Sequence, residues 1–418
     1  MNFTRLSRRT RELTRAARMA ALLLNRLIPK VEKIGGGCQK ETQMKVGMTL
    51  QLTSFGGKPD LETYQDELNL MEMCEDLGFD SVWALDHHFT GYVMSPDPTQ
   101  LLSYVAGRTK RVQLGTAVIV LPWHDPVAIA EKIALLDVLA GGRTIFGFGR
   151  GAATVEYNGY RVNMEEARER FVEAAIIVRK GLTQHSFSFD GKYYKIPEIQ
   201  IRPRPISHPE QRFYASSVSP ESAEIMAKLG FGVLIIAQRS WEDTAADYAR
   251  YRDTAIANNI TPRPPIGLLN FLVSEDASEA AELGATHLEA MWDSIDSHYH
   301  FSDGHLRGVK GYEFYAKLEK TYSKLQADTQ AKAKAIEFFR SLHAAGTPAQ
   351  VLEKMRYIHQ TVALEHVIGT FAFGGLPYPK LEKSFKLFTE KVLPVLKNDL
   401  AFEYPKELGS SARTSASK

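Results

Sequence analysis

The chain has 418 residues, 44% of them hydrophobic and 24% charged, which is typical of a globular protein with a large buried core. The two cysteines, Cys38 and Cys74, have no metal or redox spacing, so a disulfide framework is excluded and a reducing, cytoplasmic compartment is expected. Residues 1–43 hold 10 Lys and Arg against 3 Asp and Glu, whereas the remaining residues hold 41 against 46. An acidic body without a basic stripe argues against nucleic-acid binding.

Residues 1–43 form a basic leader ahead of the first strand pattern. Its Arg-rich, acid-poor composition resembles a transit peptide, and Arg8-Arg9 fit a secretion signal, but Asn25-Arg26 cut its apolar run short. We favour a simpler interpretation, in which the true start is Met44 and the leader is disordered or a start-site artefact. The sequence has no apolar run near the ~20 residues that span a bilayer, so no membrane segment is expected.

From Val46 onward, short β-rich runs alternate with helical stretches. Strands are predicted at 46–50, 81–85, 112–121, 143–149, 213–217, 232–236, 265–273 and 367–373, and helices at about 61–77, 99–109, 126–139, 164–182, 220–229 and 241–258. Residues 187–201 are predicted to form a small β excursion. Residues 297–331 are either a lid over the seventh strand or a solvated helical insertion.

Eight such units predict an α/β fold, a (β/α)8 TIM barrel with insertions over residues 44–398, followed by a flexible tail at 399–418. The strands are apolar throughout, as in parallel sheets that are covered on both faces. A doubly wound open sheet is the alternative. It is disfavoured because the glycines at 147–151 follow the fourth strand, whereas a dinucleotide fingerprint follows the first.

Functional side chains of a barrel collect where its strands end. The second predicted strand is followed by Asp86-His87-His88, where a carboxylate next to an imidazole can provide a general acid or base. A metal site is the alternative, but the sequence shows no second His or carboxylate cluster at ligand spacing. A histidine pair taken alone is as often structural as catalytic.

Three further strand ends carry small or anion-binding residues. The third has Ala117-Val118, where a planar ring could lie against the backbone, unless this is an ordinary buried strand. The fourth has Gly149 and Arg150, a glycine for close approach and a forked donor for phosphate. The fifth has Ser216-Ser217 directly before a helix, a typical anion site. Arg150 and the serines could hold one phosphate together, whereas serines that only cap the helix would mean little.

These motifs, in this order, resemble the bacterial-luciferase family of flavin-dependent alkanal monooxygenases. The likeness rests on Asp86–Thr90, Gly115–Pro122, Gly149–Gly151, Gly346-Thr347-Pro348 at the start of a late helix, and Leu387–Lys397 near the end. It extends over roughly Met44 to Asn398. Several local motifs in the right order are far more specific than any one of them.

The resemblance implies roles for residues around the flavin ring. His87 matches the catalytic histidine, held by Asp86 or a nearby group. Ala117 and Val118 match a pair that is joined by a non-prolyl cis peptide under the ring, and Trp292 matches a residue that faces the flavin pocket.

The resemblance also implies a phosphate site. Arg150, Ser216 and Ser217 match the positions that hold the FMN phosphate, and Arg168 matches a second basic position near it. Two residues depart from the family pattern: Gly149 stands where the luminescent enzymes carry a cysteine, and Ser216 stands in place of a glutamate. Both departures argue against efficient light emission and leave flavin binding intact.

The implied activity is a monooxygenation in which reduced FMN, delivered by a separate flavin reductase, activates O2 as a C4a-hydroperoxyflavin. The implied substrate is small and apolar, such as an aldehyde oxidised to a carboxylic acid. Phe55, Phe89, Trp123 and Trp292 line an apolar pocket or belong to the core. A deazaflavin-dependent oxidoreductase and a non-catalytic flavin-binding protein are the alternatives. The helices after strands two and three resemble the surface that pairs luciferase subunits, so a dimer is expected.

Overall fold

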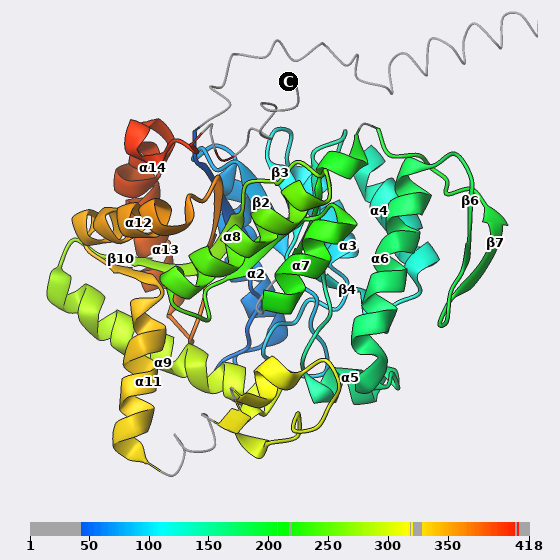
Figure 1. Ribbon diagram of the computed structural model, residues 1–418. Helices are drawn as coiled ribbons and strands as arrows, with labels where there is room; N and C mark the ends of the chain where they lie inside the picture. The colour runs from blue at the N-terminus through cyan, green and yellow to red at the C-terminus, as the bar shows by residue number, and fades with distance from the viewer. Residues whose placement is uncertain are drawn as a thin grey trace, which may run out of the picture. The chain divides into compact units, whose positions relative to one another are not determined.

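In the computed structural model, the described residues are 43–206, 208–216, 220–317, 319–320, 328–405 and 408, and among them eight parallel strands form a closed barrel (Figure 1). In order around the barrel they are β1 (Lys45–Leu50), β2 (Ser81–Ala84), β3 (Gln113–Thr116), β5 (Thr144–Gly149), β8 (Phe213–Ser216), β9 (Gly232–Ile236), β10 (Ile266–Val273) and β12 (His366–Thr370). β12 pairs with both β10 and β1, which closes the sheet. The predicted (β/α)8 barrel is confirmed, and the doubly wound alternative is wrong.

Helices surround this barrel in Figure 1. Those connecting the strands are α2 (Asp60–Cys74), α3 (Pro98–Arg108), α4 (Pro126–Leu139), α5 (Thr154–Tyr160), α6 (Ala167–Thr183), α7 (Pro220–Leu229), α8 (Trp241–Ala257), α9 (Ala277–Tyr299), α11 (Thr329–Ser341) and α12 (Pro348–Val362), and α13 (Tyr378–Leu387) and α14 (Leu393–Asn398) follow the last strand. α5 and the end of α9 lie together at one end of the barrel, where the site described below is found.

Local sequence explains where several helices begin. Asp97 and Asp125 each accept hydrogen bonds from two backbone N–H groups of the first turn, and Pro98 and Pro126 occupy the first helical position of α3 and α4. At the start of α12, the Thr347 side chain forms a reciprocal capping box with the third residue of the helix. These caps fix the loops that follow β2, β3 and β11 (Ala344–Gly346).

The third predicted strand, 112–121, is not continuous. β3 ends at Thr116, the bond between Ala117 and Val118 is a cis peptide, and β4 (Ile119–Val120) then pairs with β5 instead of β2. The β excursion predicted at 187–201 is a two-stranded antiparallel hairpin of β6 (Phe187–Asp190) and β7 (Lys195–Ile199), separate from the barrel.

The barrel interior is filled by side chains below the site. Trp83 is fully buried there and packs with Ile145, Tyr214 and Leu234. Its ring requires a glycine on the neighbouring strand, because a Cβ at Gly115 would lie 2.1 Å from the Trp83 ring. The interior is therefore packed up to the level at which the strands end.

The chain ends differ in what they show. The leader up to residue 42 lies outside the described residues, so a start at Met44 stays a prediction. The tail predicted from residue 399 differs from the structure, because Phe402 is fully buried and the Tyr404 hydroxyl lies 3.1 Å from the Tyr248 hydroxyl. Residues up to 405 therefore pack against the body. In the described part of the chain, no helix is both long and apolar enough to cross a membrane.

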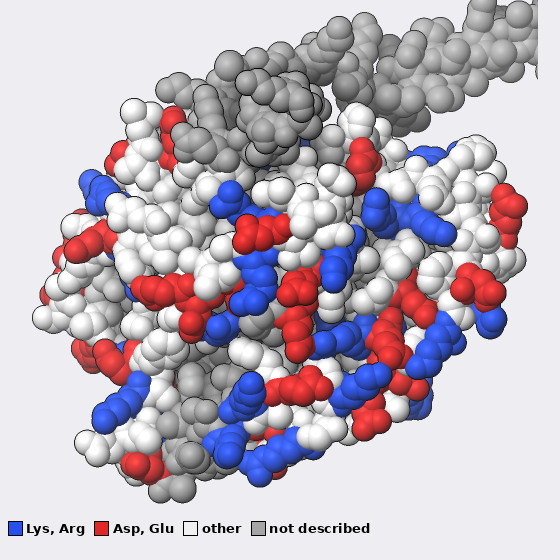
Figure 2. Space-filling view, in the orientation of Figure 1, with Lys and Arg blue, Asp and Glu red and all other residues white. Residues whose placement is uncertain are grey.

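The face of the protein in Figure 2 carries Lys and Arg interspersed with Asp and Glu, without a broad area of one sign. Exposed ion pairs of the described residues include Lys195 with Asp190 at 2.7 Å. Such pairs contribute little to stability. On this face the charge is mixed, unlike the basic stripe of a nucleic-acid interface.

Candidate active site

A cavity lies at the carboxyl ends of the barrel strands and takes its lining from most of them. It includes Gln51 after β1, His87 after β2, Arg150 after β5, Ser216 of β8 and Asn270 of β10. It encloses about 1210 Å³ of space not filled by atoms, part of it open to solvent. Its place at the carboxyl ends of the strands is where (β/α)8 barrels bind their ligands.

Six of the residues singled out from the sequence line this cavity: Asp86, His87, Ala117, Val118, Arg150 and Ser216. Gly149, Arg168 and Trp292 are not among the lining residues, and each lies behind one that is, as described below. Ser217 lies outside the described residues.

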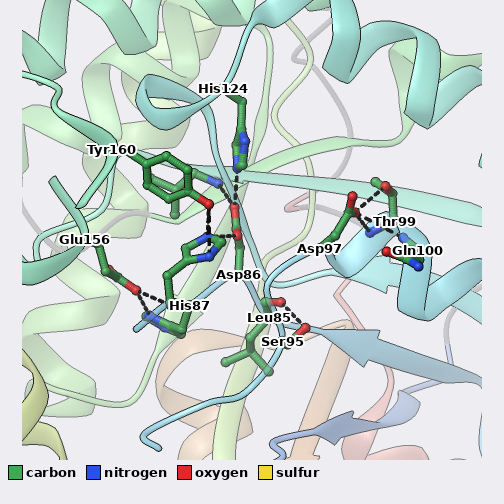
Figure 3. Close-up of polar contacts among 12 residues, drawn as sticks. Leu85, Asp86, His87, Ser95, Asp97, Thr99, Gln100, His124, Glu156 and Tyr160 are labelled. Carbon is green, nitrogen blue, oxygen red and sulfur yellow. Dashed lines mark hydrogen bonds and ion pairs between the residues drawn. The ribbon is translucent and has the colours of Figure 1, made fainter. Parts of the chain in front are cut away.

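His87 is held by a buried glutamate of α5. Its Nδ1 lies 3.0 Å from Oε1 of Glu156, and the same oxygen accepts a hydrogen bond of 2.9 Å from the backbone N–H of His88 (Figure 3). A second histidine, His298 of α9, approaches that oxygen with its Nε2 at 3.4 Å and bonds Thr90 through its Nδ1 at 2.8 Å. One carboxylate thus lies between two imidazoles, and Nε2 of His87 remains to reach a ligand.

The environment of Glu156 keeps it ionised. Burial raises its pKa, but the neighbouring His87 and the hydrogen bonds with His298 and His87 lower it more, to about 2. For His298 the balance is different: burial lowers its pKa, more than the contact with Glu156 raises it. Glu156 is therefore a carboxylate at neutral pH, while His298 favours the neutral imidazole.

Asp86 does not hold His87. Its Oδ1 lies 2.8 Å from Nε2 of His88, and its Oδ2 lies 2.9 Å from Nε2 of His124 and accepts a hydrogen bond from the Val120 backbone (Figure 3). Burial raises the pKa of Asp86, but bonds from both histidines lower it to about 2. Asp86 thus ties the end of β2 to the loop after β4, and the nearby group that orients His87 is Glu156.

Two sets of side chains have the composition of metal sites: Asp86, His88 and His124, and His87, Glu156 and His298. The sequence argument against metal spacing missed them, because each set joins segments far apart in the chain. In the first set both histidines bond the carboxylate, and in the second His87 bonds it while Nε2 of His298 lies 3.4 Å from it, so contacts between the side chains account for both arrangements without an ion. We therefore interpret both as hydrogen-bonded clusters.

Two arginines meet at one corner of the site. The Arg150 guanidinium donates to the backbone carbonyl of Gly311 and lies 4.0 Å from the centre of the Tyr312 ring. Arg168 donates to the same carbonyl at 2.9 Å and also pairs with Glu221 of α7 at 2.7 Å. Glu221 balances the charge of Arg168, whereas Arg150 donates to a neutral carbonyl and can still pair with an anion.

Ser216 and Gly149 lie on adjacent strands beside this corner, since β5 pairs with β8. A Cβ at Gly149 would lie 2.4 Å from Cγ2 of Val118 and 3.2 Å from Oγ of Ser216. Gly149 therefore does not line the cavity, but its missing side chain lets Val118 and Ser216 take their places in the lining.

Trp292 is not among the residues that line the cavity. Its ring packs on Phe339 at 5.4 Å, and Phe339 lines the cavity. On α9 the lining residues are Met291, Ile295 and Tyr299, spaced by four, and His298 lies on the same helical face, seven residues after Met291. This spacing was a signal in the sequence that could have located His298.

Of the other aromatics expected at a pocket or in the core, Trp123 is buried core, Phe89 is exposed and Phe55 lines a different surface pocket.

The segment after α9 covers the cavity. Phe301 and Tyr315 line it, and the Tyr312 hydroxyl donates to the Gly151 carbonyl at 2.8 Å. Leu306 and Tyr312 are fully buried, which does not fit a solvated insertion. Of the region predicted at 297–331, residues 318 and 321–327 lie outside the described part.

The sequence of residues 44–365 matches the luciferase-like monooxygenase family. The chain belongs to this family. Among its relatives is the alkanal monooxygenase alpha chain of Photorhabdus luminescens, 25% identical over 341 residues that cover 81% of this chain and 92% of that protein.

Solved structures of other proteins share the fold of this luciferase-like chain. A monooxygenase from Streptomyces bottropensis superposes with a TM-score of 0.71 at 25% identity, over 84% of this chain and 99% of that one. The oxygenating constituent of a diketocamphane monooxygenase from Pseudomonas putida, in complex with FMN, has a TM-score of 0.63 at 18% identity, over 84% and 98%. An F420-dependent secondary alcohol dehydrogenase has 0.64 at 17%, over 85% and 100%. The last two likenesses concern the fold alone.

Proposed function

We propose that this luciferase-like protein is a monooxygenase that uses reduced FMN and O2 to oxidise a small apolar substrate, an aldehyde or related carbonyl compound. One observation carries the proposal: a single cavity joins Arg150, the small residues Ala117 and Val118, and a histidine held by a buried carboxylate. The FMN complex of a structural relative and the alkanal monooxygenase relative support the flavin and the substrate class.

The residues present fit FMN. Arg150 and Ser216 line the cavity, and with Arg168 behind them they offer guanidinium and hydroxyl donors to a phosphate. Ala117 and Val118 line the cavity with small side chains, and the flavin ring would lie against them. Bound reduced flavin would supply the electrons that place one atom of O2 in the substrate and release the other as water.

In this scheme His87 transfers a proton during the reaction. Glu156 holds Nδ1 of His87, which lines the cavity, so Nε2 is the ring nitrogen left to give a proton to a reacting oxygen or take one from it. Tyr92, Tyr299, Phe301, Tyr315 and Phe339 form most of the aromatic lining and exclude water from the reaction. A separate flavin reductase supplies the reduced cofactor.

Flavin titrations test the phosphate corner. We expect Arg150→Gln to weaken FMN binding by about 10- to 100-fold, because a charged hydrogen bond contributes roughly 1.5–3 kcal/mol, and to leave riboflavin binding unchanged. The exposed Arg108→Gln is the matched control. A wild-type protein that retains neither FMN nor riboflavin refutes the proposal.

Turnover tests the chemistry. With reduced FMN, O2 and octanal, the wild type should form octanoic acid, and His87→Ala should form it at least ~100-fold more slowly. Unchanged oxygen-dependent product formation in His87→Ala would instead indicate that the histidine has no part in the reaction. A flavin-binding protein without catalysis would form no product with any variant.

A deazaflavin-dependent oxidoreductase is the second candidate, favoured by the F420-dependent structural relative. Such an enzyme transfers a hydride and ignores O2. Binding of F420 in preference to FMN, together with alcohol or carbonyl turnover in the absence of oxygen, would establish it in place of the first proposal.

A dimer through α3 and α4 completes the proposal. Leu135, Val138 and Leu139 of α4 and Tyr104 of α3 are large apolar residues exposed to solvent in the single chain. Clustered exposed apolar residues of this kind are typical of protein–protein interfaces.

A further inference from the structure

The cavity wall near β10 carries two buried polar side chains with incomplete hydrogen bonding. Asn270 is 4% exposed and His343, just before β11, is 7% exposed, and both line the cavity. Within the described part of the chain, neither Nδ2 of Asn270 nor Nε2 of His343 has a hydrogen-bond partner. Neither residue has a place in the proposed phosphate corner or in the proton chemistry of His87.

Both unpartnered atoms are donors. The backbone N–H of Asn270 donates to Nδ1 of His343 at 3.3 Å, and a ring nitrogen that accepts carries no proton. Burial, with the nearby charge of Lys354, lowers the pKa of His343 to about 3, so the ring is neutral at working pH. Its one ring proton is therefore on Nε2, which joins the Asn270 amide as a donor.

Asn270 and His343 each bring an unpaired hydrogen-bond donor to the cavity wall, and a bound acceptor would satisfy them. A buried donor without a partner costs about 1–3 kcal/mol, and native proteins rarely leave such donors unpaired. Met291, Ile295 and Phe339 line the same cavity, and the Phe339 ring packs on His343 at 4.5 Å. The missing acceptor therefore belongs to a molecule that is otherwise apolar.

We propose that Asn270 and His343 form a subsite for a carbonyl oxygen. They donate to a neutral C=O group of a ligand whose apolar part lies against Met291, Ile295 and Phe339. A carboxylate is a poorer fit, since Arg150 is the only cation among the described lining residues and belongs to the phosphate corner. This inference rests on the proposed function and specifies its substrate class. The carbonyl belongs either to the substrate or to the ring of the flavin.

Two probes of the same shape test the subsite in the flavin-free protein. Octan-2-one carries the carbonyl oxygen, and 2-methyloct-1-ene has a CH2 group in its place. We expect the wild type to bind the ketone about fivefold or more tightly than the alkene by ligand-detected NMR, as one or two neutral hydrogen bonds would give. His343→Phe and Asn270→Leu should each lose most of this preference and leave alkene binding unchanged.

A control and a second titration complete the test. His359→Phe removes another buried histidine with an unpartnered nitrogen, on α12 and outside the cavity lining, and should keep the preference. Melting curves establish that each variant is folded. Riboflavin is titrated in parallel. If His343→Phe binds riboflavin more weakly and the wild type shows no preference for the ketone, the carbonyl oxygen bound by Asn270 and His343 belongs to the flavin ring.

The subsite is refuted if the wild type does not discriminate the two probes and His343→Phe binds riboflavin as the wild type does. Failure of the proposed function has a different signature. In that case the wild type binds no flavin at all. Its preference for the ketone over the alkene is measured without flavin, so that result does not depend on flavin binding.

Discussion

Replacing Glu156 with glutamine removes the charge around which the site is organised. The carboxylate is fully buried, and although burial raises its pKa, His87 and the hydrogen bonds with His298 and His87 lower it to about 2 from an ordinary 4.5. At about 1.36 kcal/mol per pKa unit, the folded protein favours the ionised form by roughly 3 kcal/mol. Glutamine keeps the shape and one acceptor oxygen but not the charge. We therefore expect Glu156→Gln to lower the free energy of unfolding by up to ~3 kcal/mol at pH 7.

The pH dependence identifies the cause of this loss. Because the pKa of Glu156 is lower in the folded than in the unfolded state, its contribution is complete above about pH 4.5 and disappears as the pH falls towards 2. Urea unfolding of wild type and variant at pH 7 and pH 3.5 should show the gap between them narrowing by about 1.4 kcal/mol. The exposed Glu353→Gln on α12 is the control and should show no gap at either pH.

The same variant should slow product formation by about 100-fold without changing FMN affinity, because His87 loses its orienting partner but the phosphate corner is untouched. A stability gap that is equal at pH 7 and pH 3.5 would refute the electrostatic argument. Unchanged turnover would refute the assignment of Glu156 as the positioning residue.

Three further changes have defined outcomes. Gly149→Ala places a Cβ 2.4 Å from Val118, so it should lower the free energy of unfolding by about 1–3 kcal/mol and weaken FMN binding. An unchanged flavin titration would show that Val118 can move aside. Burial raises the pKa of Glu67 to about 8, so its stabilising effect is complete below about pH 4.5 and is lost as the pH rises through 8. Between pH 5 and 8.5, the melting temperature of the wild type should therefore fall more than that of Glu67→Gln. Melting temperatures that change in parallel with pH would contradict this. Leu139, on α4, is 56% exposed, and Leu139→Glu should convert the dimer to a monomer in sedimentation. Leu61→Glu on α2 should leave the dimer intact. If both variants remain dimers, the interface lies elsewhere on the protein.

Local sequence was sufficient to predict most of the barrel. The structure has α7 at Pro220–Leu229 and β9 at Gly232–Ile236, the ranges that apolar runs and glycine or proline punctuation predicted. The break after Thr116 was not predicted from the pattern, because an apolar run from 112 to 121 has the same appearance whether or not the strand is continuous. Residue propensities describe the local chain, whereas the break in this strand is set by the packing of the barrel around the site.

The partners within the site could not be predicted in the same way. Glu156 lies 69 residues from His87 in sequence, and Thr90 lies 208 residues from His298. Closure of the barrel brings these pairs together, and no local pattern encodes it. The resemblance matched Trp292 to a residue that faces the flavin pocket; in the structure its neighbour Met291 lines the cavity, and the role of Trp292 stays a prediction.

The geometry after β2 explains why the neighbouring carboxylate could not serve His87. In an extended segment, successive side chains point to opposite sides, so residues two apart share a side. Asp86 and His88 are such a pair and bond each other at 2.8 Å, and His87 between them faces Glu156. A carboxylate next to a histidine in sequence is therefore poorly placed to orient it here, and the partner has to come from another segment. Asp86 instead holds His88 and His124 and so fixes the backbone from which His87 projects, which makes it a structural residue of the site and Glu156 the positioning one.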